Sequence, residues 1–324
     1  MWALIGGHLT AVVTVTETVH SSATSPATSP VPAPAPALAL HPGQADAPRA
    51  GFTPFLRASL GLHLVAAAAP IWLPGAWPWS VGALLLNHAA ISGAGLWPRA
   101  RLLGPNITRL PPEAAARGEL ALTLDDGPCP QVTPLVLDLL DLHQQRATFF
   151  VIAQRAAAYP ALLREITARG HSVQNHSFQH RHNFSLLGPR GYARELSRAQ
   201  ETLADLCGEW PRFFRAPAGL RNPFLQAELL RQGLQLTSWT RRGFDTRERD
   251  PARVLARLMR GLAGGDILLL HDHHSAIAAD GRPVVLHVLP ALLSALGAAG
   301  LRSVTLPQAL PDPLTRPAVL PPLF

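Results

Sequence analysis

The polar residues that could do chemistry lie in five separate stretches, each of which follows a short apolar run. In the first stretch Asp125 and Asp126 are adjacent, and their charges repel each other unless a cation or an arginine holds them. In a later stretch His176 and His180 are four residues apart, which allows both imidazoles to reach one metal ion. The other three stretches are Arg215-Ala216-Pro217-Ala218-Gly219, Trp239 followed by Asp245, and His271-Asp272.

Each stretch taken singly also has a purely structural interpretation. Asp-Asp-Gly-Pro is an ordinary turn sequence, and one His-x-x-x-His pair says little in a chain with 14 histidines. Arg215 would be one exposed arginine among 28, and His271 would be a histidine buried at a strand end. Five such stretches in order, each at the end of a predicted strand, are hard to explain as turns alone and favour an active site.

The elements that must position these residues alternate between strand and helix from Glu119 onward. Seven short apolar runs predict buried strands, at 120–124, 147–153, 171–174, 212–217, 234–239, 266–271 and 302–306. Amphipathic stretches between them predict helices, among them 133–143, 160–169, 192–206, 251–262 and 284–299. The alternation predicts a parallel α/β fold, a distorted or incomplete (β/α) barrel of about seven strands. Because the carboxyl ends of such strands form the active-site rim, the five stretches are expected to meet there.

Composition excludes several classes of protein. The 324 residues are 48% hydrophobic and 15% charged, which is typical of a folded chain with a sizeable core. The net charge of +7 comes from 28 arginines and no lysine, spread without a dense basic tract, so we expect no nucleic-acid partner. Two cysteines, Cys129 and Cys207, are too few for a disulfide framework or a Cys-rich zinc site, and we expect both to be reduced.

The chain divides into four predicted segments. Residues 1–52 are rich in Pro, Ala and Ser and predict a disordered tether. Residues 53–104 form a hydrophobic segment, 105–310 carry the five stretches, and 311–324 form a Pro-rich tail.

The hydrophobic segment contains 41 consecutive residues without a charge, between Arg57 and Arg99. This length suits two membrane-spanning helices joined at the turn 74–78, with tryptophans gathered at the turn and at the far end. Two histidines and an asparagine inside the stretch are costly in lipid, so a helical pair packed on the following domain is the alternative. The flanking arginines place both outer ends, and the domain that follows, on the cytoplasmic side of a bacterial inner membrane.

Taken together, the five stretches resemble the motifs of the polysaccharide deacetylase family, the NodB-homology domain of carbohydrate esterase family four. The sequences TLDDGP, HSFQH, RAPAG, the Trp239–Asp245 segment and LLLH are similar to its five motifs in order, over about Glu119 to Leu306. The resemblance implies a distorted (β/α) barrel that hydrolyses N-acetyl or O-acetyl groups on sugars, usually with zinc or another divalent ion. The implied partner is an N-acetylated glycan or glycolipid.

The resemblance also implies roles for individual residues. Asp126, His176 and His180 would bind the metal and leave open positions on it, as a hydrolytic site requires. Asp125 would be the general base, and Arg215 would hold Asp125 ionised, since an adjacent cation lowers the pKa of a carboxyl group.

On the leaving-group side, the resemblance makes His271 the general acid and Asp245 the carboxylate that orients it. The backbone N–H of Ala218 would donate to the oxyanion that develops on the acetyl group. The residues expected to contact substrate are Pro217, Gly219 and Trp239.

Some positions depart from the family pattern. Leu124 replaces a common Phe, Ala218 a common Tyr and Thr246 a common Trp. His182 matches no motif, and Cys129 is interpreted as loop packing. Residues 272–274 enlarge the His271 cluster and are interpreted as solvated loop, with substrate contact as the alternative.

The sequence therefore predicts a membrane-tethered, metal-dependent glycan N-deacetylase. One alternative keeps the fold and metal but acts on a non-sugar amide or imide, or on an O-acetyl ester. The other is a catalytically silent, membrane-anchored glycan-binding module, which would have no need for a base, an acid and metal ligands together.

Overall fold

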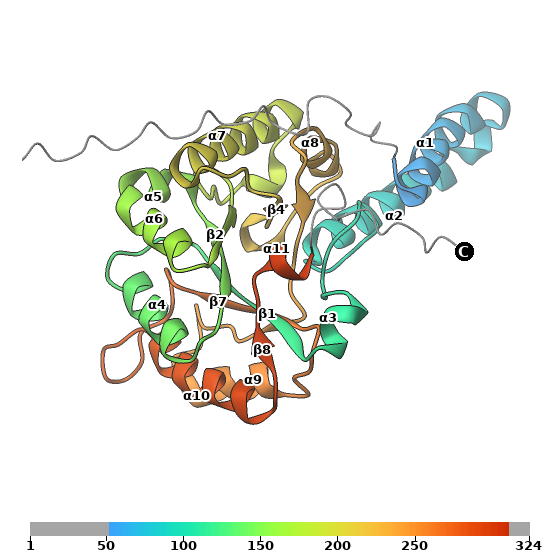
Figure 1. The fold of residues 1–324 in the computed structure, drawn as a ribbon. Coiled ribbons are helices and arrows are strands. Elements are labelled where there is room, and N and C mark those ends of the chain that lie inside the picture. Colours follow the sequence, from blue (N-terminus) through green and yellow to red (C-terminus); the bar gives the residue numbers. More distant parts are fainter. Residues whose placement is uncertain (1–51, 311–324) are drawn as a thin grey trace, which may run out of the picture. The chain divides into compact units, whose positions relative to one another are not determined.

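The computed structural model describes residues 52–310 and contains the predicted alternation of strands and helices (Figure 1). The described strands pair in parallel in the order β5-β4-β3-β2-β1-β7-β6, and β8 pairs with the start of β1. Their bounds are β1 Glu119–Asp125, β2 Ala147–Val151, β3 Ser172–Asn175, β4 Phe213–Phe214, β5 Gln235–Leu236, β6 Arg241–Arg242, β7 Ile267–His271 and β8 Arg302–Ser303. The predicted α/β half-barrel is thus confirmed. Only the short β6 was missed, because two arginines carry no apolar signal.

The helices of the barrel lie where amphipathic stretches predicted them, with short additions. Their bounds are α3 Pro112–Ala116, α4 Thr133–Leu142, α5 Ala153–Ala158, α6 Pro160–Ala168, α7 Pro189–Cys207, α8 Leu225–Arg231, α9 Pro251–Met259, α10 Val284–Ala298 and α11 Leu306–Ala309. Both cysteines are free thiols, and Cys129 packs in the core as expected. The predicted tether, apart from its last residue, and the predicted tail lie outside the described residues.

Two further helices precede the barrel, α1 (Pro54–Trp72) and α2 (Trp77–Leu96), joined by a 3₁₀ turn at Pro74–Ala76. They confirm the hydrophobic hairpin. Its polar residues meet across the pair. The Asn87 amide donates to the Ser59 hydroxyl at 2.7 Å, and the Nε2 atoms of two histidines, one on each helix, lie 3.3 Å apart. Such contacts reduce the cost of polar groups in an apolar hairpin.

Within residues 52–310, α1 is the one helix that is both long and apolar enough to cross a membrane. The second helix has 20 residues but is not among the helices that meet both requirements. That the hairpin crosses the membrane twice therefore remains a prediction.

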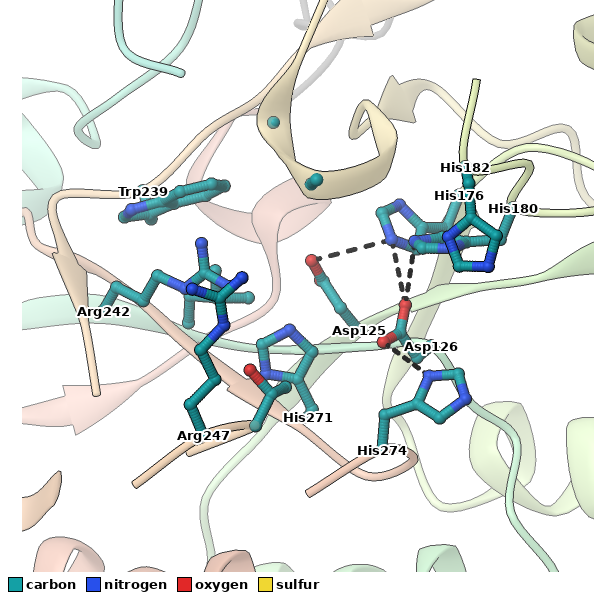
Figure 2. Close-up of a pocket in the computed structure, with 14 residues that line it drawn as sticks. Asp125, Asp126, His176, His180, His182, Trp239, Arg242, Arg247, His271 and His274 are labelled. Carbon is teal, nitrogen blue, oxygen red and sulfur yellow. Dashed lines mark hydrogen bonds and ion pairs between the residues drawn. The ribbon is translucent and has the colours of Figure 1, made fainter. Parts of the chain in front are cut away.

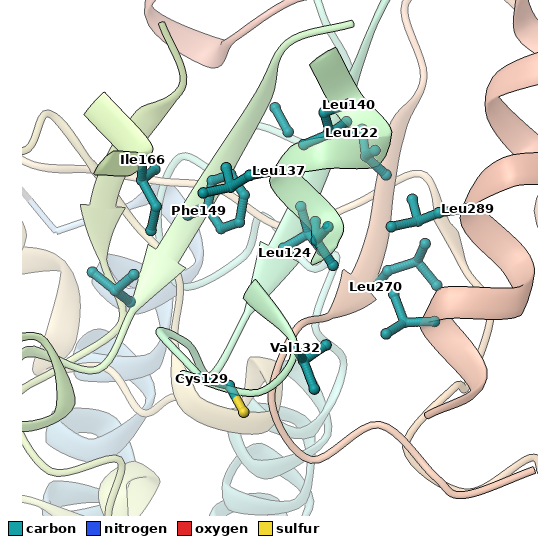
Figure 3. Close-up of a cluster of buried hydrophobic side chains, with 14 of the residues drawn as sticks. Leu122, Leu124, Cys129, Val132, Leu137, Leu140, Phe149, Ile166, Leu270 and Leu289 are labelled. Carbon is teal, nitrogen blue, oxygen red and sulfur yellow. The ribbon is translucent and has the colours of Figure 1, made fainter. Parts of the chain in front are cut away.

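Strand β1 separates the core from the site because its side chains alternate between the two faces of the sheet. Leu122 and Leu124 pack with Leu137 of α4 and Leu289 of α10 in the main hydrophobic cluster (Figure 3). Each such burial stabilises the fold by roughly 1.5–3 kcal/mol. A shift of the strand register by one residue would move these leucines to the other face of the sheet. Their burial against the helices therefore also fixes Asp125 on the face opposite to them.

Candidate active site

A cleft of about 330 Å³ opens where β1, β3, β4 and β7 end (Figure 2). The strand pairing explains why residues far apart in sequence share it, since Asp125 on β1 is directly opposite His271 on β7. The cleft is lined by Asp125, Asp126, His176, His180, His182, Ala218, Gly219, Trp239, Arg242, Thr246, Arg247, Leu269, His271 and His274.

The three predicted metal ligands form one cluster in the cleft. The Asp126 Oδ1 atom lies 3.3 Å from Nε2 of His176 and 3.3 Å from Nε2 of His180, and the three potential ligand atoms all lie within 4.8 Å of one another. Asp126 and His180 have positive φ angles, of 73° and 53°. This left-handed backbone turns both side chains into the cleft, a conformation that short polar residues tolerate better than branched ones.

The chemistry of these residues fits a divalent metal ion. The Nδ1–H of His176 donates to the carbonyl oxygen of Arg215 at 2.8 Å, so the Nε2 lone pair faces Asp126. The Asp126 Oδ1 atom is buried without a hydrogen-bond partner among the described residues. Lone pairs that face one another in a buried space need a cation between them, and one carboxylate with two imidazoles is a common zinc ligand set.

Electrostatics also favour positive charge at this cluster. Burial lowers the pKa of His180 to about 4, which keeps its imidazole neutral as a metal ligand must be. Burial also acts to lower the pKa of His176, but the carboxylates of Asp125 and Asp126 outweigh it and raise that pKa. The two carboxylates thus attract a cation, whether a proton or a metal ion.

Asp125 is held by Arg215, a fully buried arginine from the loop after β4. The guanidinium donates to Oδ1 of Asp125 at 2.6 Å, to the hydroxyl of Thr123 at 2.8 Å and to the carbonyl oxygen of Ser238 at 2.9 Å. It also lies 4.1 Å from the ring centroid of Phe150. With one oxygen so engaged, the Oδ2 atom faces the metal cluster, 3.9 Å from His176 Nε2. Asp125 is therefore oriented and held next to a permanent positive charge.

His271, the β7 neighbour of Asp125, is oriented by Asp245. The Asp245 carboxylate accepts from the His271 backbone N–H at 2.8 Å through Oδ2 and lies 2.9 Å from the ring Nδ1 through Oδ1. Burial acts to lower the pKa of His271, but the Asp245 carboxylate outweighs it and the pKa is raised. Because its pKa is raised, His271 stays protonated to higher pH, as a general acid in the cleft requires.

Three of the four remaining predicted residues line the cleft. Ala218 has a φ of 54° in the 3₁₀ turn after Arg215, and it lines the cleft together with Gly219 and Trp239. Pro217 is buried and does not line the cleft.

The structure adds residues that sequence reasoning missed or misjudged. The interpretation of residues 272–274 as solvated loop is wrong for Asp272, which is fully buried and accepts from the Thr133 hydroxyl at 2.5 Å; burial raises its pKa to about 7. His274, half exposed, places Nδ1 3.1 Å from Asp126 Oδ2. Arg242 and Arg247 also line the cleft. Arg242 lies within the Trp239–Asp245 segment and Arg247 two residues after it, and this closeness in sequence was the available signal.

Comparisons with known proteins agree with this geometry. A family model described as polysaccharide deacetylase matches residues 113–237. The chitooligosaccharide deacetylase of Bradyrhizobium sp. (strain ANU 289) is 34% identical over 194 residues, which cover 58% of this chain and 88% of that protein. The chain belongs to the polysaccharide deacetylase family.

Other polysaccharide deacetylases match over the same region. The peptidoglycan-N-acetylglucosamine deacetylase PgdA of Listeria monocytogenes is 32% identical over 177 residues, or 54% of this chain. The match spans 37% of that relative's length.

Solved structures of polysaccharide deacetylases share the fold. The family 4 carbohydrate esterase of Streptomyces lividans has a TM-score of 0.52 and 32% identity, covering 57% of this chain and 91% of that one. A family 4 pseudoenzyme from Bacillus anthracis has a TM-score of 0.56 and 20% identity, covering 63% and 68%. Because a pseudoenzyme has this fold too, the residues in the cleft, rather than the fold, bear on catalysis.

Proposed function

We propose that this protein is a metal-dependent glycan N-deacetylase that hydrolyses the acetamide of an N-acetylated sugar to acetate and a free amine. The observation that carries the proposal is the arrangement around one cleft. A buried base held by an arginine and a histidine held by a carboxylate both lie beside the Asp126–His176–His180 cluster in this cleft. The related peptidoglycan and chitooligosaccharide deacetylases support a sugar substrate.

Asp126, His176 and His180 would hold the metal, with zinc as the ion their ligand set favours. Such an ion, when bound, polarises the acetyl carbonyl and makes water a stronger nucleophile. Asp125 accepts a proton from the attacking water, and Arg215 holds this carboxylate in place through its hydrogen bond to Oδ1.

His271 completes the reaction on the leaving-group side. As water oxygen bonds to the acetyl carbon, the backbone N–H of Ala218 donates to the carbonyl oxygen, on which negative charge develops. When the C–N bond breaks, His271 gives its proton to the sugar nitrogen, and Asp245 stabilises the charged imidazole before that transfer.

We further propose that the α1–α2 hairpin anchors the protein in the bacterial inner membrane. The hairpin exposes many large apolar side chains, at Leu60, Leu64, Val65, Ile71, Trp72, Leu73, Trp77, Trp79, Val81, Leu85, Leu86, Leu96 and Trp97. So much exposed apolar surface is rare on a protein that meets only water. The flanking arginines favour a cytoplasmic catalytic domain.

The experiment that tests the reaction uses Asp125→Ala in the full-length protein. Acetate release from N-acetylglucosamine oligomers and peptidoglycan fragments is expected to be chelator-sensitive in the wild type and to fall at least about 10³-fold in the variant. Metal content, measured by elemental analysis, is expected to be retained. Asp205→Ala, an exposed carboxylate of α7, is the matched control.

Retained turnover in Asp125→Ala would overturn the mechanism. Acetate release from O-acetyl esters or non-sugar amides alone would move the assignment to the first alternative substrate class. Glycan binding without acetate release from any substrate would favour the silent binding module.

A further inference from the structure

Two arginines in the cleft have no part in the reaction proposed above. Arg242 ends β6 and Arg247 lies in the loop after Asp245, and both line the cleft (Figure 2). Figure 2 shows both side chains on the Trp239 side, across the cleft from His176 and His180.

Arg242 is positioned by aromatic contacts and not by an ion pair. Its guanidinium lies 5.4 Å from the ring centroid of Trp239 and 5.1 Å from that of Phe244. Its Nε is buried and has no hydrogen-bond partner among the described residues. A buried donor left unpaired costs free energy, so its presence in a cleft points to a partner that a ligand supplies.

The acidic residues near these arginines already have other partners. Asp125 is paired with Arg215, Asp245 with His271, and Glu248 with Arg257 at 3.0 Å. Neither cleft arginine forms an ion pair with any residue in the part of the chain that the structure describes.

The positive charge of Arg242 also affects the pKa of a neighbouring group, Arg215. Burial lowers the pKa of Arg215, and the positive charge of Arg242 lowers it further. The cleft thus holds two guanidinium groups that form no ion pair with any described residue, in the same pocket as the Asp126–His176–His180 cluster.

We propose that Arg242 and Arg247 form an anion subsite for a phosphoryl group on the N-acetylated sugar. This inference rests on the proposed deacetylase function and names its substrate class, a sugar phosphate. A phosphoryl group carries close to two negative charges, which matches two guanidinium groups, and its oxygens accept hydrogen bonds from the planar arginine fork. A neutral oligosaccharide would leave both charges without a partner.

The hairpin makes a lipid-linked sugar phosphate one natural source of this group. Pro98, two residues after α2, accepts from the Ser238 hydroxyl at 2.5 Å, and Arg99 donates to the carbonyl oxygen of Thr240 at 3.3 Å. The end of the hairpin is thus bound to the strand segment that carries Trp239 and Arg242. A soluble sugar phosphate presents the same chemistry, and the experiment distinguishes the two.

The test compares matched substrates with full-length protein in detergent micelles. N-acetylglucosamine 1-phosphate and its neutral counterpart, methyl N-acetylglucosaminide, differ only in the charged group, and N-acetylglucosaminyl polyprenyl diphosphate supplies the lipid arm. The expected ratio of kcat/KM, phosphorylated over neutral, is about 10 or more in the wild type. Arg242→Gln and Arg247→Gln should each lower this ratio about tenfold.

Arg249→Gln is the matched control, because it removes an exposed charge from the same loop outside the cleft. It should leave the ratio unchanged. A higher kcat/KM for the polyprenyl substrate than for the 1-phosphate assigns the group to a lipid carrier, and the reverse order assigns it to a soluble sugar.

A ratio near one in the wild type, or a ratio insensitive to both cleft arginines, would overturn the subsite. A preference for the carboxylate of N-acetylmuramic acid over the phosphate would overturn the phosphoryl assignment. Calorimetric titration with N-acetylglucosamine 1-phosphate separates the two proposals. Arginine-dependent binding without acetate release would retain the subsite and reject the deacetylase, whereas acetate release without arginine-dependent binding would do the opposite.

Discussion

Asp125 and Asp126 are neighbours in the chain, but their carboxylates have different partners. Side chains of consecutive strand residues normally point to opposite faces. The positive φ of Asp126 ends that alternation, so both carboxylates reach the cleft. Arg215 then engages one, while two imidazoles face the other. These different partners give the two carboxylates different proposed roles, Asp125 as the base and Asp126 as a metal ligand.

The His271–Asp245 pair predicts a pH dependence. Asp245 raises the pKa of His271, and the acid must be protonated, so turnover should fall as pH rises through that pKa. Asp245→Asn removes the charge that raises the pKa. The alkaline limb of the kcat–pH profile should therefore move to lower pH, by about one to three units.

Asp280→Asn is the control for this experiment, because Asp280 pairs with His287 at 3.0 Å away from the cleft. Its profile should match the wild type. An alkaline limb that stays in place in Asp245→Asn would remove His271 from the role of acid. The raised pKa also has a stability consequence: it stabilises the fold at low pH, and this contribution is lost as pH rises through the folded-state pKa.

At the scale of elements, the 3₁₀ turn Pro217–Gly219 joins the cleft to the end of the hairpin. Gly219 has a φ of +75°, and a Cβ there would lie 2.7 Å from Pro98 and 2.8 Å from the indole of Trp239. The turn thus needs glycine both for its backbone and for the close approach of two elements.

Gly219→Ala should lower the free energy of unfolding by about 1–3 kcal/mol, since it adds backbone strain and overpacking. It should also raise KM, because Trp239 must shift in the wall of the cleft. Urea denaturation and steady-state kinetics measure the two effects.

Gly297→Ala in α10 is the contrasting variant, since a Cβ there meets nothing within 4 Å. Helix propensity predicts that it stabilises the protein by about 0.5–1 kcal/mol. Equal effects of the two substitutions would contradict the assigned packing of Gly219.

At the scale of the whole molecule, the segment after α2 is part of the catalytic domain's structure. The Arg221 backbone N–H donates to the carbonyl oxygen of Gly95 at 3.1 Å, and its guanidinium donates to that of Ala100 at 2.5 Å. Arg221 is 4% exposed, so loss of these acceptors would leave a buried charge without its partners.

A fragment that starts at Asn106 should therefore be less stable than one that starts at Gly93. The expected difference in free energy of unfolding is about 3 kcal/mol, the order of one or two lost hydrogen bonds to a buried charge. Urea titration of both fragments measures it. Coincident midpoints and slopes would show that residues 93–105 add nothing to the stability of the barrel.

The two-span hairpin predicts on which side of the membrane the end of the chain lies. A reporter fused after Phe324 should read cytoplasmic, because two spans flanked by arginines return the chain to its starting side. Deletion of residues 54–96 should move the protein from the membrane pellet to the supernatant. A periplasmic location of the reporter would mean a single span, in keeping with α1 as the one candidate span among residues 52–310.

The local features of this protein could be predicted from its sequence alone. Apolar runs located seven strands, the 41 uncharged residues located the hairpin, and five short motifs located the cleft, since each of these signals lies within a few consecutive residues. Such signals also indicated that Asp125, Asp126, His176 and His180 would meet, because parallel strands end at one edge of a sheet.

Only the tertiary structure decided which other residues share that edge and what they contact. His274 reaches Asp126 across 148 residues, and Arg242 enters the cleft on a strand with no apolar signal. The burial of Asp272 was likewise not foreseen. The physical reason is that periodicity records which face of one element is buried, whereas partners across elements depend on how the whole sheet curls and packs.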